Sequence, residues 1–269
     1  MNDNNLTIII TCFQSDFKLR SCLNTIDKRY KVIVIENSDR SYFKRQIEND
    51  YKNVKCLLTY ENLGYSKGNN IGLKEVKTKY ALILNPDTLL DKNAIQNFFK
   101  FASEVKKFAI VGPGINQKRI TQVKYIKGFA LFLNLEELND TGFFDENFFM
   151  YLEDIDLCRR LTNKGKGIFV DPQIKIFHEG ASSHNEKINY EVELSRNWHW
   201  MWSKLYFNKK YYGIIFSILN ISPNLISAIF KLLVFYFINK RKSKIYSQRL
   251  SGIINSLMGK KSWYRPTLD

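Results

Sequence analysis

A carboxylate that could bind a metal ion follows one of the apolar runs of this sequence. Asn85-Pro86-Asp87 comes directly after Tyr80–Leu84. A hard divalent cation on a diphosphate needs few protein ligands, often one carboxylate, because phosphates and waters supply the rest. Asn, Pro, Asp and Thr are also turn-forming residues, so this motif alone favours an ordinary turn and helix cap.

A second acidic group, Glu153-Asp154, stands after the aromatic loop 142–151, at the start of a segment with helical spacing. Stabilisation by the helix dipole is sufficient to explain acidic residues there. However, Asp156 and Arg160 are spaced to pair with each other, which would leave Glu153 and Asp154 facing elsewhere. Aromatic neighbours would partly desolvate such an acid, and this suits a general base.

Two further candidates are weaker. His178 ends an apolar run before a Gly- and Ser-rich segment, but a lone histidine is more often structural than a metal ligand. The segment 62–72 is a Gly- and Asn-rich approach to a helix, which could place backbone N–H groups with Lys67 or Asn69 near an anion. No G-K-S/T follows, so it is not a P-loop, and an ordinary glycine-capped loop would look similar.

Alternating strands and helices must position these residues. We expect strands at Leu6–Cys12, Lys31–Glu36, Val54–Tyr60, Tyr80–Asn85 and Phe108–Val111, separated by helices at 15–28, 40–50, 66–77 and 91–106. This alternation predicts an α/β fold with a mostly parallel sheet and a ligand crevice at the carboxyl ends of its strands. The polar residues that follow the first, second and fourth strands should converge there.

The pattern changes after residue 123. We expect a strand at Val123–Leu133, a short helix, the aromatic loop, a helix at Glu153–Asn163 and a strand pair that ends at Phe177-His178. Composition turns aromatic and basic near 185–195. The sequence therefore predicts a catalytic domain at 1–190 and a helical C-terminal region at 191–269 that associates with a membrane.

The net charge of +15 is concentrated at one end of the chain. After Glu193 the only acidic residue is Asp269, whereas thirteen of the 41 basic residues lie there. Residues 1–193 thus hold 28 basic and 25 acidic side chains, a net charge of +3. Such a distribution predicts an anionic partner for the C-terminal region alone.

The compartment is indicated by the cysteines and the first residues. The four cysteines form no C-x-x-C pair, which favours neither a zinc site nor a disulfide framework, and we expect small buried side chains in a reducing compartment. The start MNDNNLTIII lacks the basic and long apolar regions of a secretory signal. We therefore expect the catalytic part in the cytoplasm.

An apolar segment at 211–239 has one charge in 29 residues, and Ser222-Pro223-Asn224 is expected to break it. A spanning helix needs about 20 apolar residues, which neither half offers, and both flanks are basic. We expect an in-plane helix pair or a shallow re-entrant hairpin at the cytoplasmic face of the inner (plasma) membrane, peripheral or monotopic. A helical hairpin buried against the catalytic domain is the alternative.

Taken in order, these motifs resemble family 2 glycosyltransferases, most of all the rhamnosyltransferase-like branch of bacterial surface-polysaccharide synthesis. The resemblance covers residues 6–184 and is most specific in the motifs that run from Gly142 to Arg160 and from Phe177 to Gly180. It implies a GT-A fold, inversion at the anomeric carbon and a Mg²⁺ or Mn²⁺ ion. It also implies a nucleotide diphosphate sugar donor, such as dTDP-rhamnose, and a lipid-linked or glycan acceptor.

The resemblance assigns roles to the matched residues. Asp154 would be the catalytic base, Glu153 would contact the acceptor, and Asp87 and His178 would bind the metal ion. Glu36 stands where the family usually has Asp, and the segment 114–123 is short for this branch. The residues that would bind the donor nucleotide are Thr11, Glu36, Asn62, Gly64, Lys67, Asn69 and Asn85.

Two other classes of protein remain as alternatives. A nucleic-acid-binding α/β protein would interleave basic with polar residues, whereas here the basic residues flank an apolar segment, so we expect an anionic membrane surface and no nucleic acid as partner. A nucleotidyltransferase of similar build would carry a Gly-rich basic loop after the first strand. The residues Thr11-Cys-Phe-Gln-Ser-Asp16 do not form one.

Overall fold

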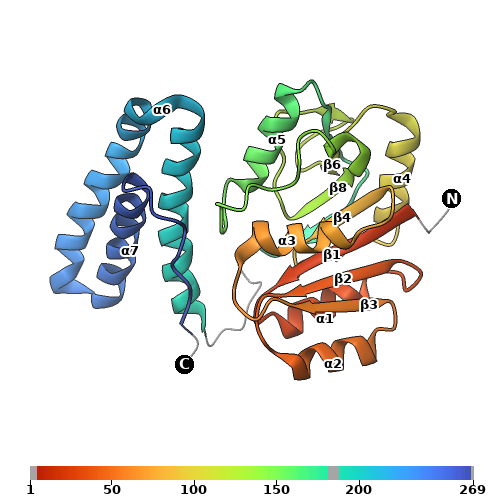
Figure 1. Cartoon of the computed structure of the whole chain (residues 1–269), viewed down its shortest axis with the longest axis horizontal. Coiled ribbons are helices and arrows are strands. Elements are labelled where there is room, and N and C mark those ends of the chain that lie inside the picture. Colours follow the sequence, from red (N-terminus) through yellow and green to blue (C-terminus); the bar gives the residue numbers. More distant parts are fainter. Residues whose placement is uncertain (1–4, 181–187, 268–269) are drawn as a thin grey trace. The chain divides into compact units, whose positions relative to one another are not determined.

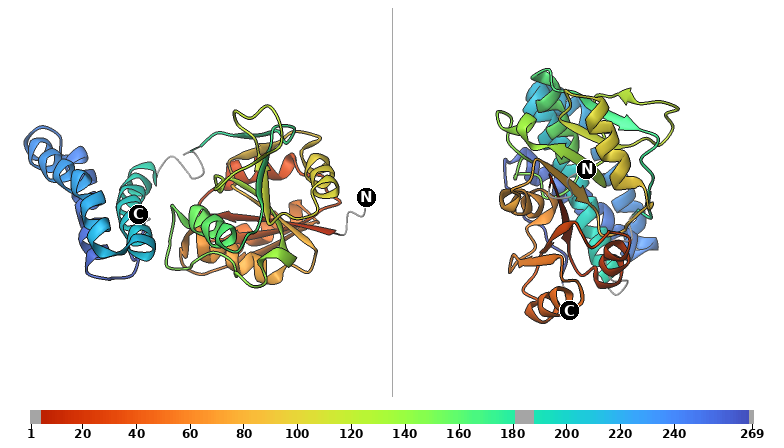
Figure 2. Two further views of the ribbon diagram at one scale, coloured as in Figure 1. Left: turned by 90° about the horizontal axis from the view of Figure 1, so that it is seen from above. Right: turned by 90° about the vertical axis from the view of Figure 1, so that its right-hand side faces the viewer.

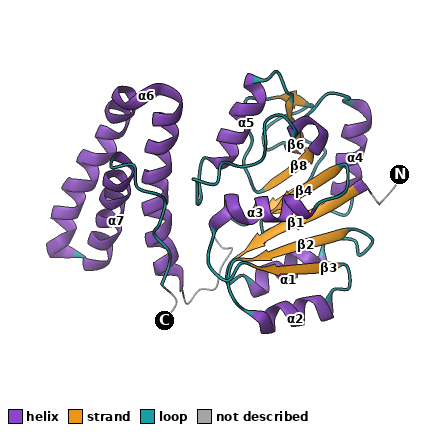
Figure 3. Cartoon of the chain, in the orientation of Figure 1, coloured by secondary structure: helices purple, strands orange, loops and turns teal. Residues whose placement is uncertain are grey.

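The computed structural model describes residues 5–180 and 188–267, and the chain divides into two compact units (Figure 1). The first, here called the α/β unit, comprises Met1–Asp145 and Asp154–Asn185. The second, the helical unit, comprises Glu146–Glu153 and Glu186–Asp269. Figure 3 shows strands and helices mixed in the first unit and long helices in the second.

An eight-stranded sheet forms the centre of the α/β unit, in the order β3-β2-β1-β4-β8-β6-β9-β7. The strands β3, β2, β1 and β4 run parallel, and β8 is antiparallel to its neighbours β4 and β6. The prediction of an α/β fold with a mostly parallel sheet is confirmed. The strand bounds are β1 (Leu6–Cys12), β2 (Lys31–Glu36), β3 (Val54–Leu58), β4 (Tyr80–Leu84), β6 (Ile110–Pro113), β7 (Thr121–Gln122), β8 (Ala130–Asn134) and β9 (Ile168–Asp171).

Helices cover both faces of the sheet, which explains why its strands are apolar throughout. Ile8 and Ile10 of β1 pack toward the face covered by α1 (Asp16–Asn24), α2 (Ser41–Asp50) and α4 (Ala94–Glu104). Ile9 packs toward the opposite face, with α3 (Gly64–Glu75) and α5 (Glu153–Asn163). Figure 2 shows α1 and α5 on opposite sides of the strands.

A separate two-stranded sheet pairs β5 (Thr88–Leu90) with β10 (Ile176–His178) in antiparallel register. Thr88 lies opposite His178. β5 begins one residue after Asp87, so this pairing carries His178 to the end of β4. Residues that are about 90 positions apart in the sequence thereby meet at one point.

Two predicted elements near this point are wrong. The strand expected at Val123–Leu133 is limited to Ala130–Asn134, with Thr121–Gln122 forming the short β7, because the backbone before residue 130 leaves the sheet. The strands β9 and β10 do not pair with each other, since β9 pairs with β6 and β7. A turn at Asp171 separates them, in which the Asp171 carboxylate accepts from the Gln173 N–H at 2.8 Å. The predicted short helix is one 3₁₀ turn at Leu135–Leu138.

The helical unit consists of α6 (Asn189–Ile238) and α7 (Lys240–Leu257). α6 changes direction at Gly213, whose φ of 78° lies in the region that favours glycine. α7 packs closely on the first part of α6, because a Cβ on Gly252 would lie 2.3 Å from the Trp198 carbonyl oxygen. Figure 1 shows α7 beside both arms of α6.

The predicted break at Ser222-Pro223-Asn224 is also wrong, since α6 continues through Pro223. A proline has no N–H for the carbonyl four residues earlier, which is that of Leu219. The Ser222 hydroxyl donates to this oxygen at 2.9 Å. The segment 214–238 is therefore one helix of roughly 37 Å, and α6 is long and apolar enough to cross a membrane by length and composition.

One face of this segment is an exposed apolar stripe, defined by Ile226, Phe230, Leu233 and Phe237. Their spacing of three and four residues places them on one side of the helix. Their side chains are 61% to 85% exposed. These side chains are therefore not buried within the helical unit itself.

His199 is a buried titratable group inside the helical unit. Its Nε2 lies 2.8 Å from the Tyr264 carbonyl oxygen, and its Nδ1 lies 3.0 Å from Ser262 Oγ. The ring stacks on Phe149 at 4.3 Å. Burial lowers the pKa of His199 from 6.5 to about 3.

This pKa predicts a pH dependence of stability. Below pH 6.5 the unfolded chain takes up a proton at His199 that the folded chain does not, so stability falls as the pH drops toward 3, by up to about 1.4 kcal/mol per pH unit. The variant His199→Gln should show a flatter slope in urea unfolding between pH 4 and 7. All four tryptophans lie in the helical unit, so their fluorescence reports its unfolding.

The control for this measurement is Ser256→Ala, which changes a buried side chain of the same unit that carries no titratable group. Its slope should equal that of the wild type. Equal slopes for wild type and His199→Gln would contradict the prediction.

Candidate functional site

Asp87 and His178, both predicted as metal ligands, lie together at the end of β4. His178 Nε2 is 3.3 Å from Asp87 Oδ1. Asp87 is only 4% exposed, and its Oδ1 has no hydrogen-bond partner among the described residues. The imidazole is held flat against Phe129, with ring centroids 4.6 Å apart and planes inclined by 6°.

This pair fits a divalent cation that both side chains would bind. A buried carboxylate oxygen without a hydrogen bond is unfavourable, and a cation between it and the neutral imidazole would satisfy both groups. Within residues 5–180 and 188–267 no three His, Cys, Asp or Glu residues are grouped as a metal site. The other ligands of the ion would have to come from phosphates and water.

The segment before β8 connects this pair to Asp154. The Gly128 N–H donates to Asp154 Oδ2 at 2.8 Å, and the Ile155 N–H donates to Oδ1 at 2.8 Å. The next residue, Phe129, carries the ring under His178, and its carbonyl accepts from the Asn85 N–H at 2.9 Å. Residues 128 and 129 therefore contact both the predicted base and His178, one of the two predicted metal ligands.

Burial raises the pKa of Asp154, while the backbone N–H groups of Ile155 and Gly128 counteract this effect. A carboxylate with a raised pKa accepts a proton more readily than an ordinary aspartate, as a general base must. The rings of the aromatic loop were expected to desolvate it. These rings have partners on α6: Phe148 with Tyr206, Phe149 with His199 and Tyr151 with Trp200.

The predicted pair of Asp156 and Arg160 is confirmed, with Arg160 Nε 2.8 Å from Asp156 Oδ2. Arg160 also donates to the Thr141 carbonyl at 2.9 Å and to the Phe143 carbonyl. This pair thus ties α5 to the start of the aromatic loop. Glu153 is buried and precedes Asp154 directly, and the division between the two units falls between these residues.

Thr11 and Asn69, both predicted to bind the donor, meet between β1 and α3. The Thr11 hydroxyl donates to Asn69 Oδ1 at 3.0 Å. Gly68 permits this approach, since a Cβ there would lie 2.5 Å from Thr11 Cγ2. Gly68 and Gly72 therefore allow α3 to pack closely on β1. The sequence alone indicated only a glycine-rich approach to a helix.

Glu36, which was predicted to line a nucleoside pocket, lies at the end of β2. It is fully buried, and its carboxylate accepts from the Cys12 thiol at 3.2 Å and the Ser38 hydroxyl at 2.7 Å. Arg40 forms an ion pair with it at 3.2 Å and reaches Asp16 at 2.7 Å. Glu36 therefore holds together the segments that follow β1 and β2.

The remaining predicted residues lie at the start of α3 and the end of β4. Asn62 Oδ1 accepts from the Gly64 N–H at 3.1 Å, and the Gly64 carbonyl accepts from Asn37 Nδ2 at 3.1 Å. Gly64 has a φ of 80°, which fits a glycine that starts the helix. Lys67 lies half-buried on α3, and Asn85 precedes Asp87 by two residues.

Gly128 and Phe129 were missed because the sequence placed them inside a strand. A glycine within a strand pattern signals a bulge or a close backbone approach, and Gly128 gave that signal. A Cβ there would lie 3.2 Å from the Tyr65 hydroxyl and 3.3 Å from Asp154 Oδ2. No comparable signal marked Phe129, whose role depends on a stacking partner that is distant in sequence.

Comparison with known proteins gives matches in sequence and in structure. The profile of glycosyl transferase family 2 matches residues 7–159. Rhamnosyltransferase WbbL of Escherichia coli is 26% identical over 71% of this chain and 88% of that protein. The low-salt glycan biosynthesis hexosyltransferase Agl10 of Haloferax volcanii is 22% identical over 61% of this chain and 64% of that protein.

Among solved structures, the mannosyltransferase PcManGT from Pyrobaculum calidifontis, in complex with GDP-Man and Mn²⁺, superimposes with a TM-score of 0.61 at 10% identity. The alignment covers 96% of this chain and 88% of that one. S. aureus TarS in complex with UDP-GlcNAc gives a TM-score of 0.55 at 15% identity over 97% and 93% of the two chains. These likenesses show a GT-A-like fold.

The contact between Gly128 and Asp154 predicts the effect of a small substitution. In Gly128→Ala the new methyl group would push the Asp154 carboxylate away and weaken the bond from the backbone N–H. Because that bond favours the ionised form, the pKa of Asp154 should rise further. Carbon-13 NMR of the carboxyl carbon across pH would measure it, with Lys127→Ala, which changes an exposed neighbour, as a control that should match the wild type. An unchanged or lower pKa in Gly128→Ala would contradict this role.

Proposed function

The chain belongs to glycosyl transferase family 2 and is a glycosyltransferase, and from this premise we propose that it transfers a sugar from a nucleotide diphosphate to an acceptor hydroxyl with inversion. The proposal rests on the distance of 3.3 Å between His178 Nε2 and Asp87 Oδ1, at the carboxyl end of β4. Ligands of α/β sheets bind at such strand ends.

Asp87 and His178 would hold a Mg²⁺ or Mn²⁺ ion. When bound, the ion would neutralise negative charge on the departing nucleoside diphosphate. The Mn²⁺ in the complex of PcManGT supports a divalent metal. The stacking of His178 on Phe129 fixes the plane of the imidazole, so that Nε2 stays directed at Asp87.

Asp154 would accept the proton of the acceptor hydroxyl as that oxygen attacks the anomeric carbon. The bond between the anomeric carbon and the diphosphate breaks in the same step, and a single displacement inverts the configuration. The two backbone N–H groups at 2.8 Å hold the carboxylate in one orientation. Glu153, directly before it, would contact the acceptor.

The residues that would line the donor side of the site are Thr11, Asn62, Gly64, Lys67, Asn69 and Asn85. The buried Glu36 would support them from within the fold. Thr11 lies at the end of β1 and is hydrogen-bonded to Asn69 of α3, and Asn85 follows the end of β4. The strands β1 and β4 are neighbours in the sheet. The similarity to rhamnosyltransferase WbbL supports rhamnose, delivered as dTDP-rhamnose, as the donor sugar. The name of the relative Agl10 supports a role in glycan biosynthesis. The acceptor would be a lipid-linked glycan of the cell surface.

The helical unit would hold the enzyme on the cytoplasmic face of the membrane. The exposed apolar stripe on α6 offers side chains to the lipid, and basic residues follow it at 240–244. Charged residues lie between the two helices: Lys242 of α7 is 5.2 Å from the ring of Phe235 on α6, and Lys231 of α6 is 5.3 Å from the ring of Tyr246 on α7. A full crossing would carry these charges into hydrocarbon, which favours an in-plane position.

Asp87→Ala and Asp154→Asn should fail at different steps. The first should lose metal-dependent binding of the nucleoside diphosphate, because it removes the carboxylate that tethers the ion. The second should keep that binding and lose roughly 10²- to 10⁴-fold in transfer, because only proton acceptance is removed. Calorimetry with UDP or dTDP and Mn²⁺, together with a transfer assay, would measure both. Metal-dependent binding by Asp87→Ala, or near-normal transfer by Asp154→Asn, would refute the corresponding role.

Replacement of Phe230, Leu233 and Phe237 by serine should weaken binding to anionic vesicles. Each of these exposed side chains would contribute roughly 1.5 to 3 kcal/mol when buried in lipid. Their exposure means that the triple variant should fold normally. The matched control replaces Phe17, Tyr42 and Tyr60, which are exposed on the α/β unit. Co-sedimentation with phosphatidylglycerol vesicles would test this, and equal binding by both variants would refute the membrane role of the stripe.

A further inference from the structure

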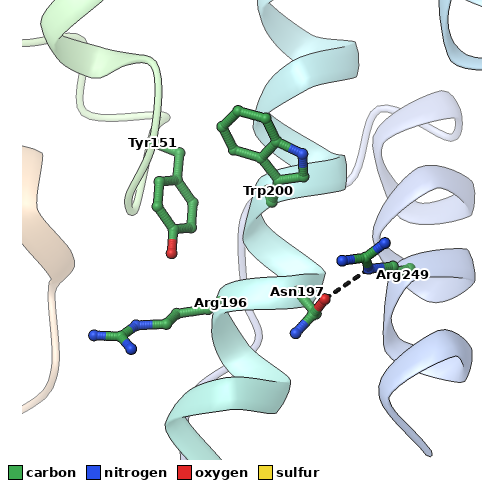
Figure 4. A pocket seen from close by; sticks show the side chains of 5 residues that line it. All are labelled: Tyr151, Arg196, Asn197, Trp200 and Arg249. Atoms are coloured by element: carbon green, nitrogen blue, oxygen red, sulfur yellow. Dashed lines mark hydrogen bonds between the residues drawn. The ribbon is translucent and has the colours of Figure 1, made fainter. Parts of the chain in front are cut away.

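A pocket of about 300 Å³ lies within the helical unit, apart from the residues assigned above. Tyr151, Arg196, Asn197, Trp200 and Arg249 line it. Figure 4 shows the rings of Tyr151 and Trp200 beside each other and the guanidinium of Arg249 turned toward Asn197. The pocket thus combines two cationic side chains with two aromatic rings.

Arg249 is oriented by its neighbours rather than neutralised by an acid. Its Nε donates to Asn197 Oδ1 at 2.6 Å, and its guanidinium lies 5.4 Å from the ring of Tyr246. Among the described residues it has no carboxylate within ion-pair distance. Its two terminal nitrogens therefore keep four N–H donors for a ligand, and a guanidinium fork matches phosphate oxygens.

The aromatic side of the pocket is also held in place. Tyr151 and Trp200 meet edge to face with ring centroids 5.4 Å apart, and Trp200 is still 41% exposed. Tyr151 and Leu152 adopt φ angles of 70° and 69°, an unfavourable conformation for such side chains. Residues held in such conformations cluster at functional sites. An exposed ring of this kind offers a flat apolar surface, and the polar groups around it would fix the orientation of a ligand.

We propose that this pocket binds a sugar that carries a phosphate or diphosphate, as the acceptor subsite of the transferase. Arg249 and Arg196 would bind the phosphate oxygens, and Trp200 would contact the sugar ring. Tyr151 lies three residues before Asp154 in the sequence, so a short covalent link joins the subsite to the proposed base. The inference rests on the proposed function, because it assigns the second substrate of the same reaction.

The test measures binding of the acceptor class to the full-length chain by calorimetry, with excess UDP or dTDP and Mn²⁺ present to occupy the donor site. The probes are dodecyl diphosphates linked to glucose, galactose or N-acetylglucosamine. We expect binding of at least one probe, and a loss of about tenfold or more in affinity in Arg249→Ala and in Trp200→Ala. Arg249→Lys keeps the positive charge but lacks the two terminal guanidinium nitrogens, so it should lose only part of the affinity. This partial loss would distinguish a lost contact from a folding defect.

Matched controls are Lys261→Ala, an exposed basic residue outside the pocket, and Trp263→Ala, an exposed tryptophan outside it. Both should stay within about twofold of the wild type, the difference expected of surface substitutions that make no contact with the ligand. No binding of any probe, or equal affinity in the pocket variants and the controls, would overturn the proposal.

Two further probes identify the source of the ligand. Dodecyl glucoside lacks the phosphate, and affinity equal to that of the diphosphate would overturn the anionic site. The free sugar 1-phosphates lack the alkyl chain, and equal affinity would support the site with a soluble sugar phosphate as its ligand. Binding of UDP and of dTDP with Mn²⁺ is measured first on the same preparation, and the nucleotide that binds is the one used in excess. Absence of binding by both would refute the proposed function, whereas nucleotide binding without an effect of Arg249→Ala would refute the subsite alone.

Discussion

The backbone N–H of Gly128 donates to the Asp154 carboxylate, and the absence of a side chain at residue 128 leaves room for this close approach. The same short segment passes Phe129 under the ring of His178 and takes a hydrogen bond from Asn85. The orientation of the proposed base and that of the proposed metal ligand His178 therefore depend on the same backbone segment. That path is available because the chain leaves the sheet before β8 instead of continuing as a strand.

Strand order supplies the rest of the arrangement. Parallel neighbours β1, β2 and β4 end at the same edge of the sheet, so the polar residues that follow them are neighbours without any specific contact being required. The pairing of β5 with β10 then adds a residue from far along the chain. The ion pair between the buried Glu36 and the partly exposed Arg40 stabilises the same edge. The site is thus assembled by the topology of the sheet and fixed in detail by a few polar contacts.

The sequence predicts the first half of the fold well because each strand there is a short apolar run between turn residues. The bounds of β1, β2 and α5 are those expected from the pattern. The segment 123–133 was mispredicted because its apolar residues look like a strand, whereas tertiary contacts of Gly128 and Phe129 decide its path. The neighbouring Asp87 and His178 could be proposed from motifs, but their distance depends on a strand pairing that local patterns do not encode. In α6 the proline suggested a break, and the glycine ten residues earlier provided it.

The hydroxyl of Ser222 donates to the Leu219 carbonyl, and this bond determines how α6 tolerates a change of the medium around it. In water the carbonyl left open by Pro223 would find a solvent partner at little cost. In hydrocarbon no such partner exists, and an open carbonyl costs several kcal/mol. Because serine supplies the missing donor from within the helix, the exchange of water for acyl chains leaves no backbone group of this turn unsatisfied. The helix can therefore keep the same backbone in both solvents.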